Sequence, residues 1–168
     1  GTSRCVCDII FLMVDDDLML EGALQRTWDA FEHHPEVSMV TRPYYWFIDS
    51  PSVPVRAVKP FDTQRDTVVT VESDRETIHA LYHTAGQISG LAFRRQHIRL
   101  TYHPDIFTTH IYIFSDMLKQ GGALLLKDYT VAVRINESMC RHNPEIYLKS
   151  PTSSWIEMFQ AVFPERRF

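Results

Sequence analysis

Apolar and polar residues alternate along the chain in short blocks that predict strands separated by amphipathic helices. A continuous apolar run over residues 8–14 ends in three aspartates, as a buried strand would. Apolar residues then recur at helical spacing, and Pro35 is expected to end this helix. The stripe predicted to be buried consists of Leu20, Leu24, Trp28 and Phe31, with Thr27 beside them.

Further runs rich in β-branched and aromatic residues predict the remaining strands. These runs are residues 38–48, 67–71 and 123–135. Lys127-Asp128 interrupts the last of them, and Pro43 must lie at an edge or bulge because proline donates no ladder hydrogen bond. The Pro-rich stretch 51–60 is predicted to be a loop, and 88–95 is another mostly apolar run.

Capping residues predict two helices in the middle of the chain and one near its end. Ser73 and Glu76 have the spacing of a capping box. Thr108 or Thr109 can cap a helix that Gly121-Gly122 would end. The last helix would open at Ser150-Pro151 or at Ser154, and its apolar face would consist of Trp155, Phe159, Val162 and Phe163.

Strands and helices that alternate in this way predict an α/β fold. We expect a mixed, mainly parallel sheet flanked by helices, formed by residues 1–168 as a single domain. No internal repeat or low-complexity segment suggests a second domain.

Composition and charge narrow the classes of function. The net charge of -4 and the pI near 6.0 argue against a nucleic-acid-binding surface, which would be basic. No apolar stretch approaches the roughly 20 residues that a membrane-spanning helix needs. The sparse cysteines, Cys5, Cys7 and Cys140, lack the spacing of zinc or redox pairs, so free thiols in the cytoplasm are expected.

The three aspartates are the first candidates for chemistry. If the segment were extended, Asp15 and Asp17 would point the same way and Asp16 the opposite way. Two converging carboxylates suit a hard cation such as Mg²⁺ or Mn²⁺, which completes its coordination with substrate phosphates. The other interpretation is that Asp17 caps the following helix while its neighbours favour the positive end of the helix dipole. Spacing alone leaves both interpretations open.

Histidines are the second candidates. His110 is expected in the first turn of a helix, where the dipole lowers the imidazole pKa and favours the neutral form, which can act as a base. His79 and His83 share one helical face, but no H-E-x-x-H pattern joins them, so a solvated surface is the simpler interpretation.

The order of these segments resembles a known family. The strand with "DDD" is followed by "GQISGLAFRR", then by "HPDIFTTHIYIFSDMLKQGG", then by the strand "ALLLKDYTVAVR". This succession is similar to the second half of family 2 glycosyltransferases with the GT-A fold. The resemblance implies a metal-dependent, inverting transfer of a sugar from a nucleotide-sugar donor to a hydroxyl acceptor, which could be a glycan, a lipid or a small molecule.

The resemblance also implies roles for individual residues. Asp15 and Asp17 would bind Mn²⁺ or Mg²⁺ and the donor diphosphate, with Asp16 beside them. The cleft that binds the substrates would be lined by Gly90, Ala92, Phe93, Arg94 and Arg95. Thr109-His110 stands where the family has Glu-Asp, so the base would be His110 or, just upstream, Asp105.

The chain departs from the family at its front. Family members carry a nucleotide-binding β-α-β half before the acidic motif, whereas only residues 1–14 precede it here. The resemblance therefore implies an incomplete GT-A fold whose open sheet edge favours self-association into a homo-oligomer. A non-catalytic, truncated segment that folds and self-associates is the alternative function. A metal-dependent phosphohydrolase is a third, for which no organised set of further ligands is evident.

Overall fold

Two small β-sheets with helices packed against them form the described part of the protein. The computed structural model describes residues 6–100, 103–105, 107–135 and 144–165. The first sheet contains, in spatial order, β1 (Ile9–Phe11), β7 (Ala92–Arg94), β3 (Met39–Thr41), β8 (Ala123–Leu125) and β6 (Thr67–Val69). The second contains β2 (Leu18–Met19), β9 (Val131–Arg134), β4 (Tyr44–Phe47) and β5 (Arg56–Val58).

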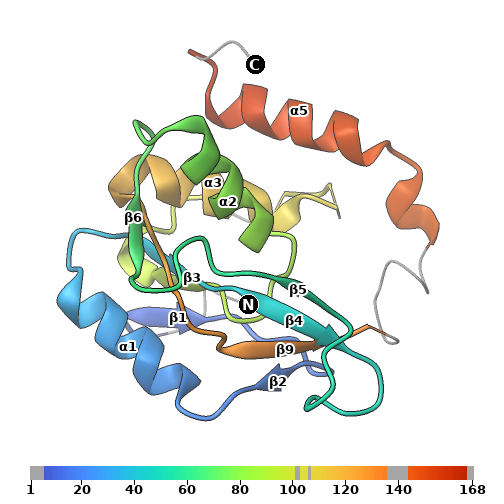
Figure 1. The fold of residues 1–168 in the computed structure, drawn as a ribbon. Helices are drawn as coiled ribbons and strands as arrows, with labels where there is room; N and C mark the ends of the chain where they lie inside the picture. The colour runs from blue at the N-terminus through green and yellow to red at the C-terminus, as the bar shows by residue number, and fades with distance from the viewer. Residues whose placement is uncertain (1–5, 101–102, 106, 136–143, 166–168) are drawn as a thin grey trace.

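Helices cover both faces of the first sheet (Figure 1). On one face, Met39, Phe93 and Leu125 pack with α2 (Arg75–Thr84), α3 (Thr109–Gly121) and α5 (Pro151–Val162). On the other face, Val40, Ala92 and Leu124 pack with α1 (Ala23–His33). Neighbouring residues of each strand contribute to opposite clusters because side chains alternate across a sheet. The α/β class predicted from the sequence is confirmed.

The prediction of a mainly parallel sheet is wrong for the described strands. Parallel pairing occurs between β3 and β8 and between β4 and β9, whereas the other five strand pairs are antiparallel. The reason is that two chain segments run side by side through both sheets. Residues 38–48 form β3 and then β4, with a break at Arg42-Pro43, and residues 123–135 form β8 and then β9 beside them. The remaining strands of each sheet pair antiparallel with these segments or with each other.

The observed helix ends agree with most of the predicted ones, although neither Thr108 nor Ser150 makes a side-chain cap hydrogen bond, and two capping predictions are wrong. α3 runs from Thr109 to Gly121, and α5 opens at Pro151 after Ser150, as expected. The N-cap of α2 is Asp74, whose carboxylate accepts the Thr77 N–H at 2.9 Å, and not Ser73. Ser73 instead accepts the Thr70 N–H at 3.0 Å, so its hydroxyl is occupied by the preceding turn.

α1 also differs from the predicted helix. It begins at Ala23, after Gly22 in a left-handed conformation, so Asp17 lies too far upstream to cap it. Its buried residues are Ala23, Thr27, Ala30 and Phe31. Leu24 and Trp28, predicted to face the core, remain 55% and 50% exposed. Half of the predicted apolar stripe therefore stays about half exposed.

Gly90 occupies a position that excludes any side chain. Its φ is +83°, and a Cβ there would lie 2.6 Å from Arg42 Nε and 2.9 Å from Val131 Cγ1. Gly22 has a similar φ of +75° but no atom within 4 Å of the equivalent Cβ position. A side chain at either glycine would strain the backbone, but only a side chain at Gly90 would also overlap neighbouring atoms.

We expect Gly90→Ala to destabilise the protein much more than Gly22→Ala. The left-handed conformation costs an alanine about 1–2 kcal/mol at either position. Overpacking against Arg42 and Val131 adds roughly 1–3 kcal/mol at Gly90 alone. Urea unfolding of both variants measures the difference, and equal free energies of unfolding would contradict the close packing at Gly90.

Candidate functional site

The three aspartates form a tight turn and not an extended segment. Residues 15–17 connect the end of the first strand region to β2, with a turn at Asp15 and Asp16 and a bend at Asp17. Asp15 is exposed, Asp16 is partly exposed, and Asp17 is buried at 9% exposure. We expected Asp15 and Asp17 to share one face because we assumed an extended backbone. That assumption is wrong, since the backbone turns at these residues.

Hydrogen bonds hold the Asp17 carboxylate in place. One oxygen accepts from the Ser89 hydroxyl at 2.6 Å, and the other accepts from the Arg134 backbone N–H at 3.0 Å. The Ser89 hydroxyl oxygen in turn accepts the Val14 N–H at 3.0 Å. Burial raises the pKa of Asp17, although these two hydrogen bonds partly oppose the rise. Asp17 thus connects the acidic turn to the Ser89-Gly90 segment and to the end of β9.

A buried arginine lies beside this turn, and the sequence interpretation did not single it out. Arg42 is 0% exposed and donates to the carbonyls of Thr84 at 2.9 Å and Gln87 at 3.0 Å, and to the carbonyl of Ser89. Burial lowers its pKa to about 10, against the favourable fields of Tyr44 and Asp17. The available signal was a charged residue inside the apolar run 38–48, directly before a proline.

His110 is fixed to the same turn from the other side. Its Nε2 lies 2.8 Å from the Ala85 carbonyl oxygen. Because a carbonyl only accepts, Nε2 carries the proton of the neutral ring, and the lone pair is on Nδ1. Burial lowers the pKa of His110, and the nearby Arg42 charge lowers it further, although the Ala85 hydrogen bond opposes both effects. Burial and the Arg42 charge therefore both favour the neutral imidazole.

The turn over residues 84–90 brings three separated parts of the sequence together. Asp17 contacts it at Ser89, Arg42 binds its carbonyls, and His110 bonds to it at Ala85. Of the segments that carry the family resemblance, the acidic cluster contacts the Ser89-Gly90 stretch, and the His110 helix contacts Ala85, at the start of the same turn. We refer to Asp15–Asp17, Arg42, His110 and the 84–90 turn as the acidic-turn site.

Most of the other residues proposed to line a cleft are packed inside the fold. Ala92 and Phe93 are buried in β7. Arg94 donates to the carbonyls of Val37 at 2.9 Å and Phe31 at 2.8 Å, which stabilises the end of α1. Arg95 is exposed at the start of a short 3-10 helix, η2 (Arg95–His97). Of these residues, Arg95 alone has an exposed side chain.

Asp105 lies in a separate cluster. One carboxylate oxygen accepts from Lys149 Nζ at 3.0 Å and the other from the Phe107 N–H at 3.0 Å. Burial raises the pKa of Asp105, but hydrogen bonds, including that from Lys149, outweigh the burial effect and lower it overall. Lys149 also pairs with Glu157 of α5. These contacts tie α5 to the loop before α3, which gives Asp105 a structural role.

The described residues offer limited ligands for a divalent cation. In the part of the chain that the structure covers, no group of three or more His, Cys, Asp or Glu side chains could hold a metal ion. Asp15 and Asp16 nevertheless present carboxylates toward solvent, and Mg²⁺ commonly uses only one or two protein carboxylates with substrate phosphates and water. The donor set therefore fits a cation that arrives with a phosphorylated ligand.

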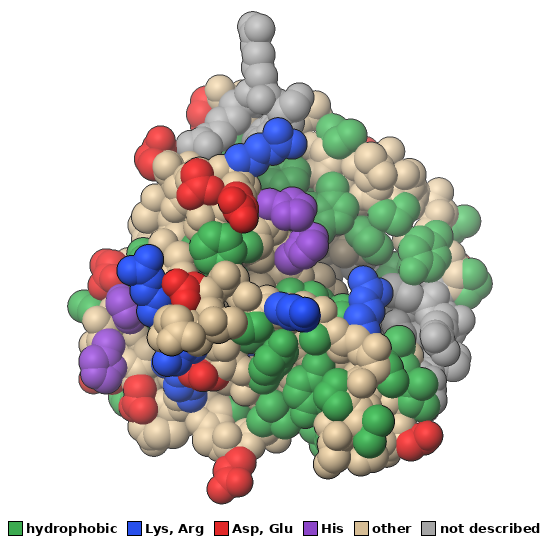
Figure 2. Space-filling view, viewed as in Figure 1, with side chains coloured by type: hydrophobic (Ala, Val, Ile, Leu, Met, Phe, Trp, Pro, Cys, Tyr) green, Lys and Arg blue, Asp and Glu red, His purple; other side chains and the backbone are tan. Residues whose placement is uncertain are grey.

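One face of the molecule carries both basic and acidic side chains. Figure 2 shows basic and acidic side chains interspersed on one face, with histidines together over α2. The rings of His79 and His83 lie 4.4 Å apart there, and both residues are exposed. Cys7 is an exposed free thiol, whereas Cys5 and Cys140 lie outside the described residues.

Comparisons with known proteins add no family to this picture. No protein-family model matches the chain, and no curated protein matches it. Within the described residues, no helix has the length and apolar character needed to cross a membrane. The assignment of a function therefore depends on the geometry of the acidic-turn site and on the resemblance of its segments.

We expect Asp17→Ala to destabilise the protein and Asp15→Ala to leave its stability unchanged. Removing Asp17 leaves the buried Ser89 hydroxyl and Arg134 N–H without their acceptor, at a cost of about 1–3 kcal/mol. Asp15 is exposed, so its removal should change the free energy of unfolding by less than about 0.5 kcal/mol. Chemical denaturation of the two variants tests this, and similar effects for both would contradict the Asp17 hydrogen bonds.

We expect His110 to make folding stability depend on pH. Its folded pKa lies below the ordinary value of 6.5, so the unfolded chain binds the proton first as the pH falls. Stability from this group is complete above pH 6.5 and declines below it. His110→Gln keeps a donor for Ala85 but cannot titrate, so its unfolding free energy should fall less between about pH 7 and pH 5. Parallel pH profiles for the two proteins would refute this effect.

Proposed function

We propose that this chain is the metal- and acceptor-binding part of a glycosyltransferase that moves a sugar from a nucleotide-sugar to a hydroxyl acceptor. The main observation behind this proposal is that Asp17 and His110 both bind the turn that contains Ser89. Residues separated by 72 and 25 positions meet there through direct hydrogen bonds. The family resemblance orders the same segments along the sequence, so the tertiary contacts support a shared role for them.

The exposed acids of the turn have the role of binding the donor. Asp15 and Asp16 would hold Mn²⁺ or Mg²⁺ together with the donor diphosphate, and the cation would offset charge on the leaving diphosphate. Asp17 is a positioning residue in this proposal, because its hydrogen bonds to Ser89 and Arg134 fix the turn that carries Asp15. Arg95 lies beside Asp8, at the opposite end of β1 from the acidic turn, so it is not a candidate for a phosphate contact there.

His110 is the candidate base. The Ala85 carbonyl fixes its Nε2–H tautomer, and its lowered pKa keeps Nδ1 unprotonated near neutral pH. An acceptor hydroxyl bound at Nδ1 could transfer its proton to the ring as it attacks the sugar from the side opposite the leaving diphosphate, which inverts the anomeric centre. Asp105 is a weaker candidate because Lys149 and the Phe107 N–H occupy its oxygens.

A specific observation favours a second candidate function. Asp17, Gly90, Arg94 and Asp105, which the resemblance places in the site, all make contacts that serve the fold itself. A glycosyltransferase segment that folds but catalyses nothing would keep these contacts, because they stabilise the fold. Ligand binding distinguishes the two functions, since only the first requires the exposed carboxylates.

We expect Mn²⁺-dependent binding of a UDP-sugar that Asp15→Asn weakens. Isothermal titration of the full chain with the UDP-sugar, with and without Mn²⁺, measures this directly. Loss of a direct ligand should cost at least the roughly 10–100-fold that loss of an outer-shell partner costs. Glu32→Gln, an exposed acid on α1, is the matched control and should bind as the unmodified chain does.

The outcome separates the candidates. Saturable binding that depends on Mn²⁺ and on Asp15 supports the enzyme. Absence of binding in every titration would favour the non-catalytic segment, and binding that Asp15→Asn leaves unchanged would exclude the acidic turn as its site.

A further inference from the structure

β1 forms one edge of the first sheet, and its outer side has no strand partner among the described residues. Its inner side pairs with β7, so that Ile10 faces Phe93 in the antiparallel register. Arg95 N–H donates to the Asp8 carbonyl, and Leu12 N–H donates to the Leu91 carbonyl, each at 2.8 Å. Backbone groups alternate in direction along a strand, so the N–H and C=O of Ile9 and Phe11 point outward.

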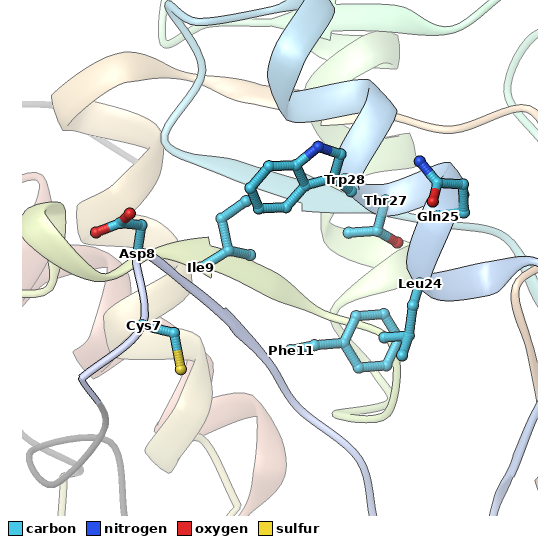
Figure 3. Close-up of a pocket in the computed structure, with 8 residues that line it drawn as sticks. All are labelled: Cys7, Asp8, Ile9, Phe11, Leu24, Gln25, Thr27 and Trp28. Carbon is cyan, nitrogen blue, oxygen red and sulfur yellow. The ribbon is translucent and has the colours of Figure 1, made fainter.

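An apolar groove lies alongside this edge. It encloses about 520 Å³ between β1 and α1, and Figure 3 shows the residues that line it: Cys7, Asp8, Ile9, Phe11, Leu24, Gln25, Thr27 and Trp28. Ile9 and Phe11 approach it from the strand, whereas Leu24 and Trp28 approach it from the helix. The outward hydrogen-bonding groups of β1 and the groove therefore belong to one continuous surface, which we call the β1 edge.

The half-exposed apolar residues of α1 belong to the β1 edge. Leu24 and Trp28 continue the apolar stripe of that helix at helical spacing, yet about half of each side chain is exposed. Exposed apolar patches beside an unpaired strand mark surfaces that pair with another strand. A strand added to β1 would supply the missing backbone partners and would bring alternate side chains over the groove.

We propose that the occupant of the β1 edge is β1 of a second copy of this chain, paired antiparallel about a two-fold axis at Ile10. In this register Ile9 of each copy faces Phe11 of the other, and their outward backbone groups make four hydrogen bonds. The second copy's Ile9 and Phe11 side chains lie on the same face as the groove because side chains alternate along a strand. Two five-stranded sheets then form one continuous sheet.

The charges along the strand favour this register. Pairing about Ile10 sets Asp8 opposite Leu12 and Cys7 opposite Met13, so no like charges face each other. A register shifted to centre on Asp8 would place the two Asp8 carboxylates together, which is unfavourable. The strand is thus self-complementary in the isologous sense that a two-fold dimer requires.

Sedimentation velocity of the full chain over a concentration series tests the proposal. We expect a reversible monomer–dimer equilibrium. Trp28→Asp and Leu24→Asp should each shift this equilibrium to the monomer. For Trp28, an aromatic anchor, the dissociation constant should rise by about thirtyfold or more. Both residues are half-exposed in the monomer, so these variants should keep its fold. Ile156→Asp on α5, at 48% exposure, is the matched control and should dimerise normally.

A backbone variant tests the strand pairing itself. Ile9→Pro removes an N–H that points outward, and edge strands tolerate proline at such a position. It should reduce dimerisation while hydrogen exchange of the inner amides of Leu12 and Arg95 stays slow. Hydrogen exchange of the Phe11 amide in the unmodified chain should slow as concentration rises.

Three results would overturn the proposal. The first is a chain that stays monomeric at its highest soluble concentration. The second is a dimer that Trp28→Asp, Leu24→Asp and Ile9→Pro leave intact. The third is a monomer whose Phe11 amide becomes protected only when an unrelated extended peptide is added, which would assign the β1 edge to a different strand. Because none of these readouts involves Mn²⁺ or a UDP-sugar, they are independent of the proposed enzymatic function.

Discussion

The burial of the Arg42 guanidinium is the interaction on which the acidic-turn site depends. A buried cation is costly unless its N–H groups are hydrogen-bonded, and the two terminal nitrogens of Arg42 donate to the carbonyls of Thr84, Gln87 and Ser89, whereas its buried Nε has no hydrogen-bond partner among the described residues. The arginine therefore requires the chain after α2 to turn tightly enough to aim three carbonyls at one point. Gly90 completes this arrangement, since any larger residue would overlap the guanidinium.

Other features of the site follow from this turn. Ser89 is held with its carbonyl toward Arg42 and its hydroxyl toward Asp17, which fixes the acidic turn. Ala85 presents the carbonyl that binds His110. The field of Arg42 acts on both neighbours, because it opposes the rise in the Asp17 pKa and contributes to the fall in the His110 pKa. One buried charge thus contributes to the pKa shifts of both an acid and an imidazole.

The division of the three aspartates between structure and solvent bears on function. Both carboxylate oxygens of Asp17 accept hydrogen bonds from the fold, whereas Asp15 is exposed and Asp16 is partly exposed. A site built in this way holds a cation only weakly without a phosphorylated ligand, because the protein supplies few carboxylates. The unpaired β1 edge is the second incomplete feature of the molecule, and both lie on the strand region that begins the described chain.

The sequence predicted those features that depend on local chemistry. Apolar periodicity and capping residues predicted the α/β class, α3 with its end at Gly121-Gly122, and the opening of α5 at Ser150-Pro151. The acidic cluster and His110 were recognised because carboxylates and imidazoles are informative by residue type alone. The prediction that Asp15 and Asp17 point the same way assumed an extended backbone. The local sequence does not distinguish an extended segment from a tight turn, and the structure has a turn.

Only the tertiary structure decided how these elements meet. Strand direction depends on contacts between distant segments, so the sequence did not show that residues 38–48 divide between two sheets. The role of Arg42 was equally hidden, because the carbonyls that satisfy it lie more than 40 positions away. The partial exposure of Leu24 and Trp28 on α1 is also set by packing. By itself, the sequence determined which residues can form helices, strands and charged sites; long-range burial and hydrogen bonding decided which of them serve the fold and which remain free to bind.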